Sequence, residues 1–280
     1  MAYLEEARRL NAAEPVTQTD DLAPKRRFAL AERWRLWLLL LVIISGWELS
    51  VARHWVEALF LPAPSTIAQT IGEGLRNGSL LINLGATLFR LLTGLVIGSS
   101  AGVGIGLLMG WSPHLCALLD PLLAMLHPLP KITLLPLVML ALGIGESSKI
   151  ATIALSCFFP MLLNTLAGVQ QIAPIYWEVA QNYGAKRWQL LTRILLPGSL
   201  PLLMTGLRLA LNTALIVTLS VELLMAQTGL GSEIWLAWQT MRLRHLYATL
   251  VVISLLGYGF NLLIVQMSFR LAPWQTQQTR

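Results

Sequence analysis

The chain has 280 residues, of which 55% are hydrophobic and 12% are charged, and its mean hydropathy is +0.65. A soluble domain carries about twice that share of charged residues, so the composition excludes an ordinary soluble protein and predicts several membrane-spanning helices. The formal net charge of +6 comes from basic residues spread over many segments. This distribution favours a role in membrane orientation over nucleic-acid binding.

Six segments are apolar enough to cross the hydrocarbon core, which needs about 20 residues of helix. After an N-terminal tail at 1–33, we predict an all-α transmembrane bundle over residues 34–274, followed by a short tail at 275–280. The predicted spans are 34–52, 83–110, 117–142, 150–172, 199–225 and 246–269.

Two segments between the spans show structure of their own. Residues 61–79 read as a proline-led turn, a short amphipathic helix and a glycine-rich end. Residues 228–245 combine a Gly-Leu-Gly turn with two tryptophans, which is typical of an interfacial or re-entrant segment.

Basic residues predict the orientation of the spans, because cytoplasmic segments carry an excess of lysine and arginine. The N-terminal tail with its flank carries seven such residues, the 172–198 loop carries three and the C-terminal end carries two. The segments on the opposite side together carry five. We therefore expect both termini and the 172–198 loop to be cytoplasmic.

The second span contains glycines at a strict four-residue step, which places a groove down one helix face. This spacing predicts close helix packing and favours a neighbouring span of the same chain over a subunit contact. The glycines of this ridge are Gly94, Gly98, Gly102, Gly106 and Gly110.

The third span contains the proline-rich sequence HPLPKITLLP at 127–136. Prolines inside a span remove backbone hydrogen bonds, so this segment should bend and should face a protein-lined or wet interior.

Ionisable residues inside the spans indicate either structural ion pairs or a substrate path, and the sequence leaves both open. A central lysine or arginine costs roughly 2.5–3.5 kcal/mol on insertion scales, so each needs a cavity or a partner. Asp120 and Glu222 are candidate partners, whereas Arg90 is expected to extend its charge toward the interface. The candidate path residues are Lys131, Arg208, Asn212 and Glu222.

No signature of catalysis or of a metal site appears in the sequence. The two cysteines and four histidines are scattered without metal-ligand spacing. The stretch GIGESSK at 143–149 lacks the Gly-Lys-Ser/Thr ending of a phosphate-binding loop. We therefore predict a chain that is not an enzyme, has no catalytic or metal-binding residues and holds no nucleotide.

A polar segment, EVAQNYGAKRWQLLTRILLPGSLP at 178–201, lies between two highly apolar stretches. We predict one short helix over 175–183, ended by Gly184 in the left-handed conformation that glycine allows. A second helix should run over 185–195 and stop at Leu196-Pro197. Two short helices joined at an elbow are suited to contacting a soluble partner, although an ordinary amphipathic surface loop would have a similar pattern.

This segment resembles the EAA loop of permease subunits of bacterial ABC importers, in which Glu-Ala-Ala is followed by a glycine and an Ile/Val-x-Leu-Pro ending. Glu178, Ala180, Gly184 and Ile194-Leu195-Leu196-Pro197 match that pattern, and Val179 departs from it. The match extends over roughly residues 34–274 and resembles the nitrate, sulfonate, taurine and bicarbonate branch. The stretches that carry this wider resemblance are LPAPS, PLPKITLLPLVMLALGIGESSK, GLRLAL and APW.

The resemblance implies a type I importer permease-like bundle in the bacterial inner membrane, surrounded by lipid, with no nucleic-acid partner. It further implies a second permease copy, two ATP-binding cassette subunits that hold ATP and Mg²⁺, and a periplasmic or lipid-anchored substrate-binding protein. No cofactor is expected on this chain. The implied ATPase-coupling residues are Glu178, Ala180, Gly184, Lys186, Leu196 and Pro197.

The resulting hypothesis is an ATP-driven importer for a small anionic solute of the sulfonate, taurine, nitrate or bicarbonate class. The alternative is an ion-driven secondary transporter or channel that works alone. Such a protein would need no segment that docks an ATPase.

Overall fold

The computed structural model describes residues 25–271 of the chain. The predicted tail at 275–280 and most of the tail at 1–33 lie outside these residues. The chain divides into two units, residues 1–55 and 56–280, and each is described by itself. In the first unit, α2 (Lys25–Ala52) is a single helix whose apolar part is Trp37–Ala52.

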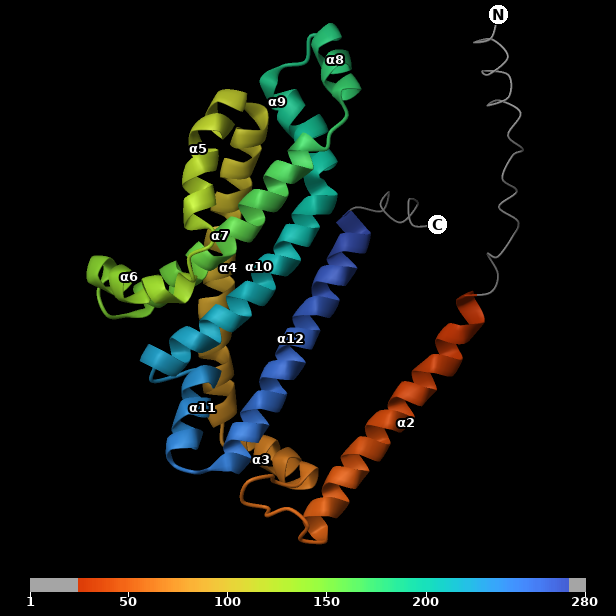
Figure 1. The fold of residues 1–280 in the computed structure, drawn as a ribbon, viewed down its shortest axis with the longest axis vertical. Coiled ribbons are helices and arrows are strands. Elements are labelled where there is room, and N and C mark those ends of the chain that lie inside the picture. The colour runs from red at the N-terminus through yellow and green to blue at the C-terminus, as the bar shows by residue number, and fades with distance from the viewer. Residues whose placement is uncertain (1–24, 272–280) are drawn as a thin grey trace, which may run out of the picture. The chain divides into compact units, whose positions relative to one another are not determined.

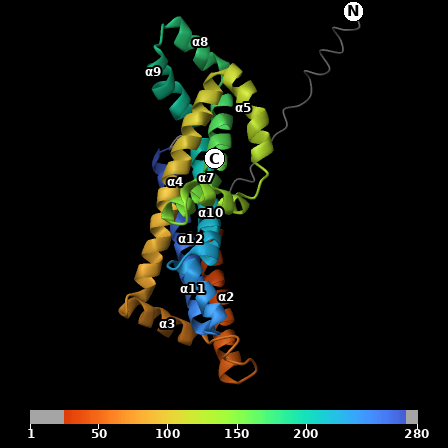
Figure 2. The same ribbon diagram turned by 90° about the vertical axis from the view of Figure 1, so that its left-hand side faces the viewer.

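Three long helices form the centre of the second unit: α4 (Ser79–Trp111), α7 (Glu146–Gln170) and α10 (Leu196–Met225). α7 packs along α4 on one side and along α10 on the other, and both views show the three lying together (Figures 1 and 2). α12 (Leu243–Leu271) packs against α10 and the segments beside it. Their lengths and apolar composition suit membrane crossing, which makes this an all-α membrane bundle.

The glycine ridge of α4 explains how closely α4 and α7 approach. A Cβ atom at Gly102 would lie 2.6 Å from the Phe158 carbonyl oxygen, and one at Gly106 would lie 2.8 Å from the Leu162 carbonyl oxygen. Larger residues would therefore collide with the backbone of α7. The predicted packing between spans of one chain is confirmed, and Gly94, Gly98 and Gly110 likewise face α7.

Shorter helices cover both ends of the second unit. α3 (Pro64–Arg76) and α11 (Leu230–Gln239) lie at one end, where the sequence predicted a short amphipathic helix and a re-entrant or interfacial segment. α8 (Pro174–Asn182) and α9 (Arg187–Leu190) lie at the opposite end, beyond α4 and α7 (Figure 1).

The third predicted span is not one straight helix. α5 (Pro113–Leu126) is followed by the 3₁₀ turn η1 (Lys131–Leu134) and α6 (Leu135–Leu142), and the two halves are bent by 90°. Pro128 and Pro130 explain the break, since the residue before a proline is disfavoured in the α conformation. The predicted bend is confirmed, and at 90° it divides the segment into two separate helices.

Candidate functional site

The elbow at residues 174–190 has the predicted left-handed break. Gly184 adopts a φ of +65°, and the Ala185 N–H donates to the Ala180 carbonyl oxygen at 2.9 Å. This six-to-one hydrogen bond, with glycine in the left-handed position, is the Schellman arrangement that ends helices. Nothing lies within 4 Å of a Cβ built on Gly184, so its conformation, not crowding, requires glycine.

The second helix of the elbow does not stop at Leu196-Pro197, which corrects the prediction. α9 passes through a π-helical turn, η2 (Leu191–Leu195), directly into α10, giving a continuous helix of 39 residues over Arg187–Met225. The Leu196 N–H donates to the Leu191 carbonyl oxygen, five residues back. The wider turn accommodates Pro197, which has no N–H and clashes with a regular α-helical turn.

The elbow exposes several large apolar side chains together with charged ones. Glu178 and Lys186 are exposed, whereas Ala180 is only 6% exposed. Exposed large apolar side chains rarely cluster on a surface that has no partner. Those on the elbow are Ile175, Tyr176, Val179, Tyr183 and Trp188.

A groove of about 520 Å³ lies beneath the elbow, between the end of α7 and the π-helical turn. Pro197 lines it together with Tyr176 and Arg193, while Leu196 is exposed beside it. The predicted coupling residues thus gather at one end of the bundle.

Arg208 and Asn212 are exposed on a face of α10 that none of the described residues of the second unit covers. Their spacing of four residues aligns them along the helix. Lys131 is located differently: its ammonium group lies 4.4 Å from the centre of the Phe159 ring and donates to the His127 carbonyl oxygen at the end of α5. These contacts attach Lys131 to the 90° bend.

Arg90 is fully engaged in a polar cluster that we define as Thr87, Arg90, Glu146, Glu222 and Thr228. Its guanidinium Nε and Nη2 donate to the two carboxylate oxygens of Glu146 at 2.6 and 2.9 Å. Nη1 donates to Glu222 at 2.7 Å and to the Thr228 carbonyl oxygen at 2.6 Å, and Nη2 also donates to the Thr228 hydroxyl at 3.1 Å. All five N–H donors therefore have an acceptor, which makes a buried arginine tolerable.

Glu222 is completely buried, and both of its carboxylate oxygens are occupied. Oε1 accepts from Arg90, and Oε2 accepts from the Thr87 hydroxyl at 2.9 Å and from the Gly231 N–H at 3.0 Å. The Thr87 oxygen in turn accepts from the Leu230 N–H at 2.8 Å. A buried carboxylate with this many donors is a structural centre that fixes the start of α11.

The Gly-Leu-Gly turn leaves space for that carboxylate. A Cβ at Gly229 would lie 2.6 Å from Glu222 Oε2, and one at Gly231 would lie 2.5 Å from the Leu219 carbonyl oxygen. Gly229 also has a φ of +124°, where other residues are strained.

Two predictions about these charges are therefore wrong. Glu222 neither pairs with Arg208 nor lines an open path, and Arg90 does not extend to the interface but is 3% exposed. Their pairing joins residues 132 apart in sequence. The available signal was the presence of two charged residues, Arg90 and Glu222, in apolar spans, but nothing in the sequence indicates that they lie close together.

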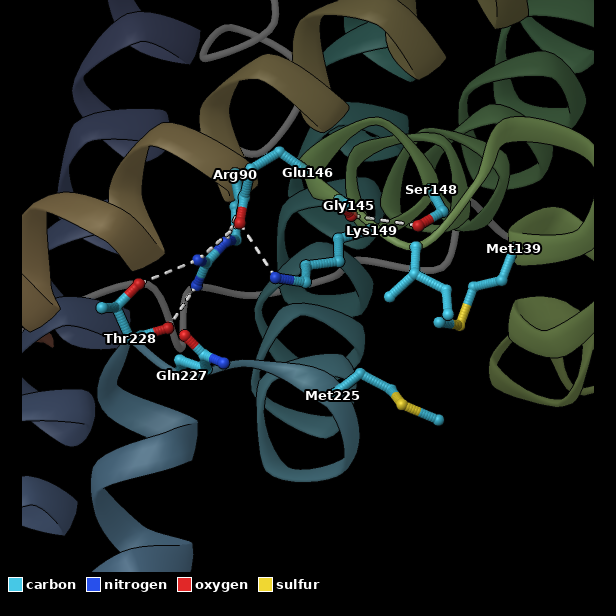
Figure 3. A pocket seen from close by; sticks show the side chains of 10 residues that line it. Arg90, Met139, Gly145, Glu146, Ser148, Lys149, Met225, Gln227 and Thr228 are labelled. Carbon is cyan, nitrogen blue, oxygen red and sulfur yellow. Dashed lines mark hydrogen bonds and ion pairs between the residues drawn. The ribbon is translucent and has the colours of Figure 1, made fainter.

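A pocket of about 280 Å³ opens beside the polar cluster. Figure 3 shows Arg90 from α4 and Glu146 and Lys149 from the first turn of α7 meeting at Thr228 and Gln227 of the loop before α11. Lys149 donates to Glu146 at 2.9 Å, so one carboxylate links two cations. The side chains of Met139, Ile144 and Met225 form the apolar part of the pocket lining.

Comparison with known proteins gives consistent matches. Residues 94–276 match the family of binding-protein-dependent transport system inner membrane components. The taurine transport system permease protein TauC of Escherichia coli is 32% identical over 240 residues, which cover 84% of this chain and 87% of TauC. The nitrate import permease protein NrtB of Synechocystis is 28% identical, with 83% and 86% coverage.

Further matches support the same fold and family. The putative aliphatic sulfonates transport permease protein SsuC of Bacillus subtilis is 32% identical, covering 86% of this chain and 88% of SsuC. A chain of the MetNI methionine ABC transporter in an inward-facing conformation superposes with a TM-score of 0.60 at 17% identity, covering 68% of this chain and 94% of that chain. The chain therefore belongs to the family of binding-protein-dependent transport system inner membrane components, as an ABC importer permease of the nitrate, sulfonate and taurine branch.

Proposed function

We propose that this permease imports a small organic or inorganic anion and that residues 175–197, which contain most of the elbow, couple transport to separate ATPase subunits. In this proposal, ATP and Mg²⁺ are held by those subunits, a substrate-binding protein delivers the anion, and this chain performs no catalysis itself. The exposed apolar and charged surface of the elbow is the observation that carries the proposal.

The elbow has the properties of a docking element. Its first helix contacts the bundle through Trp177, which packs against the cluster of Leu107, Val169 and Leu195, while Glu178 and Tyr183 remain exposed. The left-handed conformation of Gly184 sets the angle between the short helix and the segment that follows it. A displacement of the short helix can therefore move the continuous helix from Arg187 to Met225. This geometry supports mechanical coupling between a partner at the elbow and the centre of the bundle.

The uncovered face of α10 supports a transport path shared with a second permease copy. Arg208 would be costly if it faced lipid near the middle of a span, so a second copy or an aqueous path should cover it. Asn212 adds a hydrogen-bonding amide to the same face. Lys131 is a further proposed residue of the path, and the His127 carbonyl and the Phe159 ring hold its ammonium group at the bend.

The anionic substrate class is supported by two facts. The relatives are permeases for taurine, aliphatic sulfonates and nitrate. The charge on the uncovered face is Arg208, a cation that would attract an anion and still release it. With the basic-residue bias of the sequence, we place the elbow and both termini in the cytoplasm of a bacterial inner-membrane complex.

The test compares two exposed glutamates at opposite ends of the second unit. In liposomes containing the permease, its ATPase and its binding protein, Glu178→Ala should lose ATPase co-purification and uptake. A charge-assisted hydrogen bond contributes about 1.5–3 kcal/mol, so the loss of association should be about tenfold or more. Glu73→Ala on α3 is the matched control and should behave as wild type. Normal uptake by Glu178→Ala would refute the coupling proposal.

A further inference from the structure

We infer that the pocket beside the polar cluster is an entry subsite for an alkylsulfonate-like anion, which binds there by replacing the Glu146 carboxylate. The pocket lies between α6, the first turn of α7 and residues 225–228. This inference rests on the proposed anionic substrate class, and it adds a site separate from the Arg208 face.

Arg90 is the fixed receptor in this pocket. The residue is only 3% exposed, and its Nη1 donates a hydrogen bond to the completely buried Glu222. Thr228 fixes the guanidinium from the side. The Nε and Nη2 donors that Glu146 uses form the planar fork that binds a carboxylate or a sulfonate equally well.

Glu146 is the replaceable ligand, and its exposure distinguishes it from Glu222. Its side chain is 47% exposed, so the carboxylate borders solvent and an incoming anion can reach the Arg90 donors that it uses. With Glu146 bound, the charges of Arg90, Lys149, Glu146 and Glu222 cancel. When Glu146 leaves, the pocket has a net positive charge that an incoming anion can neutralise.

Lys149 adds a second cation with remaining capacity. Its side chain is only 12% exposed, and Glu146 is the one hydrogen-bond acceptor that its ammonium has within the described part of the chain. Two further N–H donors are thus available to a ligand with three oxygens. The first turn of α7 also lines the pocket, and its backbone dipole favours the same charge.

The walls select for an apolar tail on the anion. Met139, Ile144 and Met225 contribute sulfur and hydrocarbon surface opposite the charged groups. Methionine adapts to chains of different shape, which suits a short alkyl group. Exchange of one anion for another on the same cations gives little net free energy, so binding should be weak and release easy.

The experiment measures binding to the full-length permease alone in zwitterionic lipid nanodiscs, with empty nanodiscs as blank. The probes are butanesulfonate and methanesulfonate, followed by saturation-transfer NMR. Wild type should bind butanesulfonate weakly. Glu146→Gln should bind it at least about threefold more tightly, because the competing carboxylate is gone.

Three variants separate the site from general effects. Lys149→Gln should weaken butanesulfonate binding, and Arg76→Gln, which removes an exposed charge on α3, should leave it unchanged. Ile144→Ser should weaken butanesulfonate more than methanesulfonate, and this residue is 88% exposed, so the variant should fold. Equal affinity of wild type, Glu146→Gln and Lys149→Gln would overturn the subsite.

Uptake by the complete importer distinguishes this failure from failure of the proposed function. Normal sulfonate or nitrate uptake without any pocket binding would refute the subsite and leave the anion importer intact. Pocket binding of butanesulfonate that depends on Lys149, with no anion uptake by the active complex, would instead refute the proposed substrate class.

Discussion

The polar cluster and the elbow differ in how far their side chains find partners within the described part of the chain. In the cluster, Arg90 and Glu222 come from distant helices, are buried, and have every hydrogen-bonding group of the arginine satisfied. In the elbow, apolar side chains such as Tyr183, which is 87% exposed, have no cover within the described residues. The difference shows that the polar cluster is satisfied within this chain, whereas the apolar side chains of the elbow are left uncovered by the described residues.

The largest effect on stability is expected when the same substitution, arginine to glutamine, is compared at Arg90 and at Arg208. Arg90→Gln leaves Glu222 buried without its counter-charge, and breaking a buried pair typically costs about 3–5 kcal/mol. Its thermal unfolding midpoint and folded yield in detergent should fall sharply. Arg208→Gln removes an uncovered charge and should keep the folded yield while transport per folded molecule falls. Normal folding of Arg90→Gln would contradict the structural role of the cluster.

A second prediction tests the turn that encloses Glu222. Gly229→Ala introduces both a strained φ and an overlap with the carboxylate, and it should cost about 3 kcal/mol. Gly143→Ala is the matched control, since Gly143 has a φ of +82° but nothing within 4 Å of an added Cβ. With a ψ of 171°, Gly143 lies in a region that is almost exclusive to glycine, so the control should cost this backbone strain alone and lower the unfolding midpoint less than Gly229→Ala does. Equal unfolding midpoints would show that Glu222 moves easily, against a rigid cluster.

A third prediction compares two glycines of the same helix. Gly98 packs against the backbone of Ala154, whereas Gly104 has nothing within 4 Å of an added Cβ. Gly98→Ala should reduce the free energy of unfolding by about 2 kcal/mol through overpacking. Gly104→Ala should be neutral or slightly stabilising, because alanine is the better helix former. Thermal unfolding in detergent measures both.

The smallest effect on stability is expected at the elbow hinge. Gly184→Val places a β-branched residue at positive φ and should strain the elbow by about 1–2 kcal/mol. The bundle should keep its unfolding midpoint, while ATPase co-purification and substrate-stimulated ATP hydrolysis fall. Gly184→Asn, a residue that tolerates the left-handed conformation, should retain much of both. If valine and asparagine are equally active, the hinge geometry does not matter for coupling.

The local features of this fold were predictable from the sequence because each depends on near neighbours. The glycine step predicted the close face of α4, Gly184 predicted the left-handed break, and the prolines at 128 and 130 predicted the bend before α6. The family could also be inferred, since the elbow pattern is a continuous stretch. Even locally, the π-helical turn before Pro197 was missed, because an extra residue in a helical turn leaves no separate mark in composition.

Tertiary structure decided which charges meet. Arg90 contacts Glu222 across 132 residues and Glu146 across 56, and no periodicity within one helix encodes such a pairing. The sequence alone therefore determined that this is a helical permease with two short helices joined at Gly184. Only the packing of α4 against α7 and α10 determined that Arg90 and Glu222 form a buried pair, because that packing brings their helices within hydrogen-bonding distance.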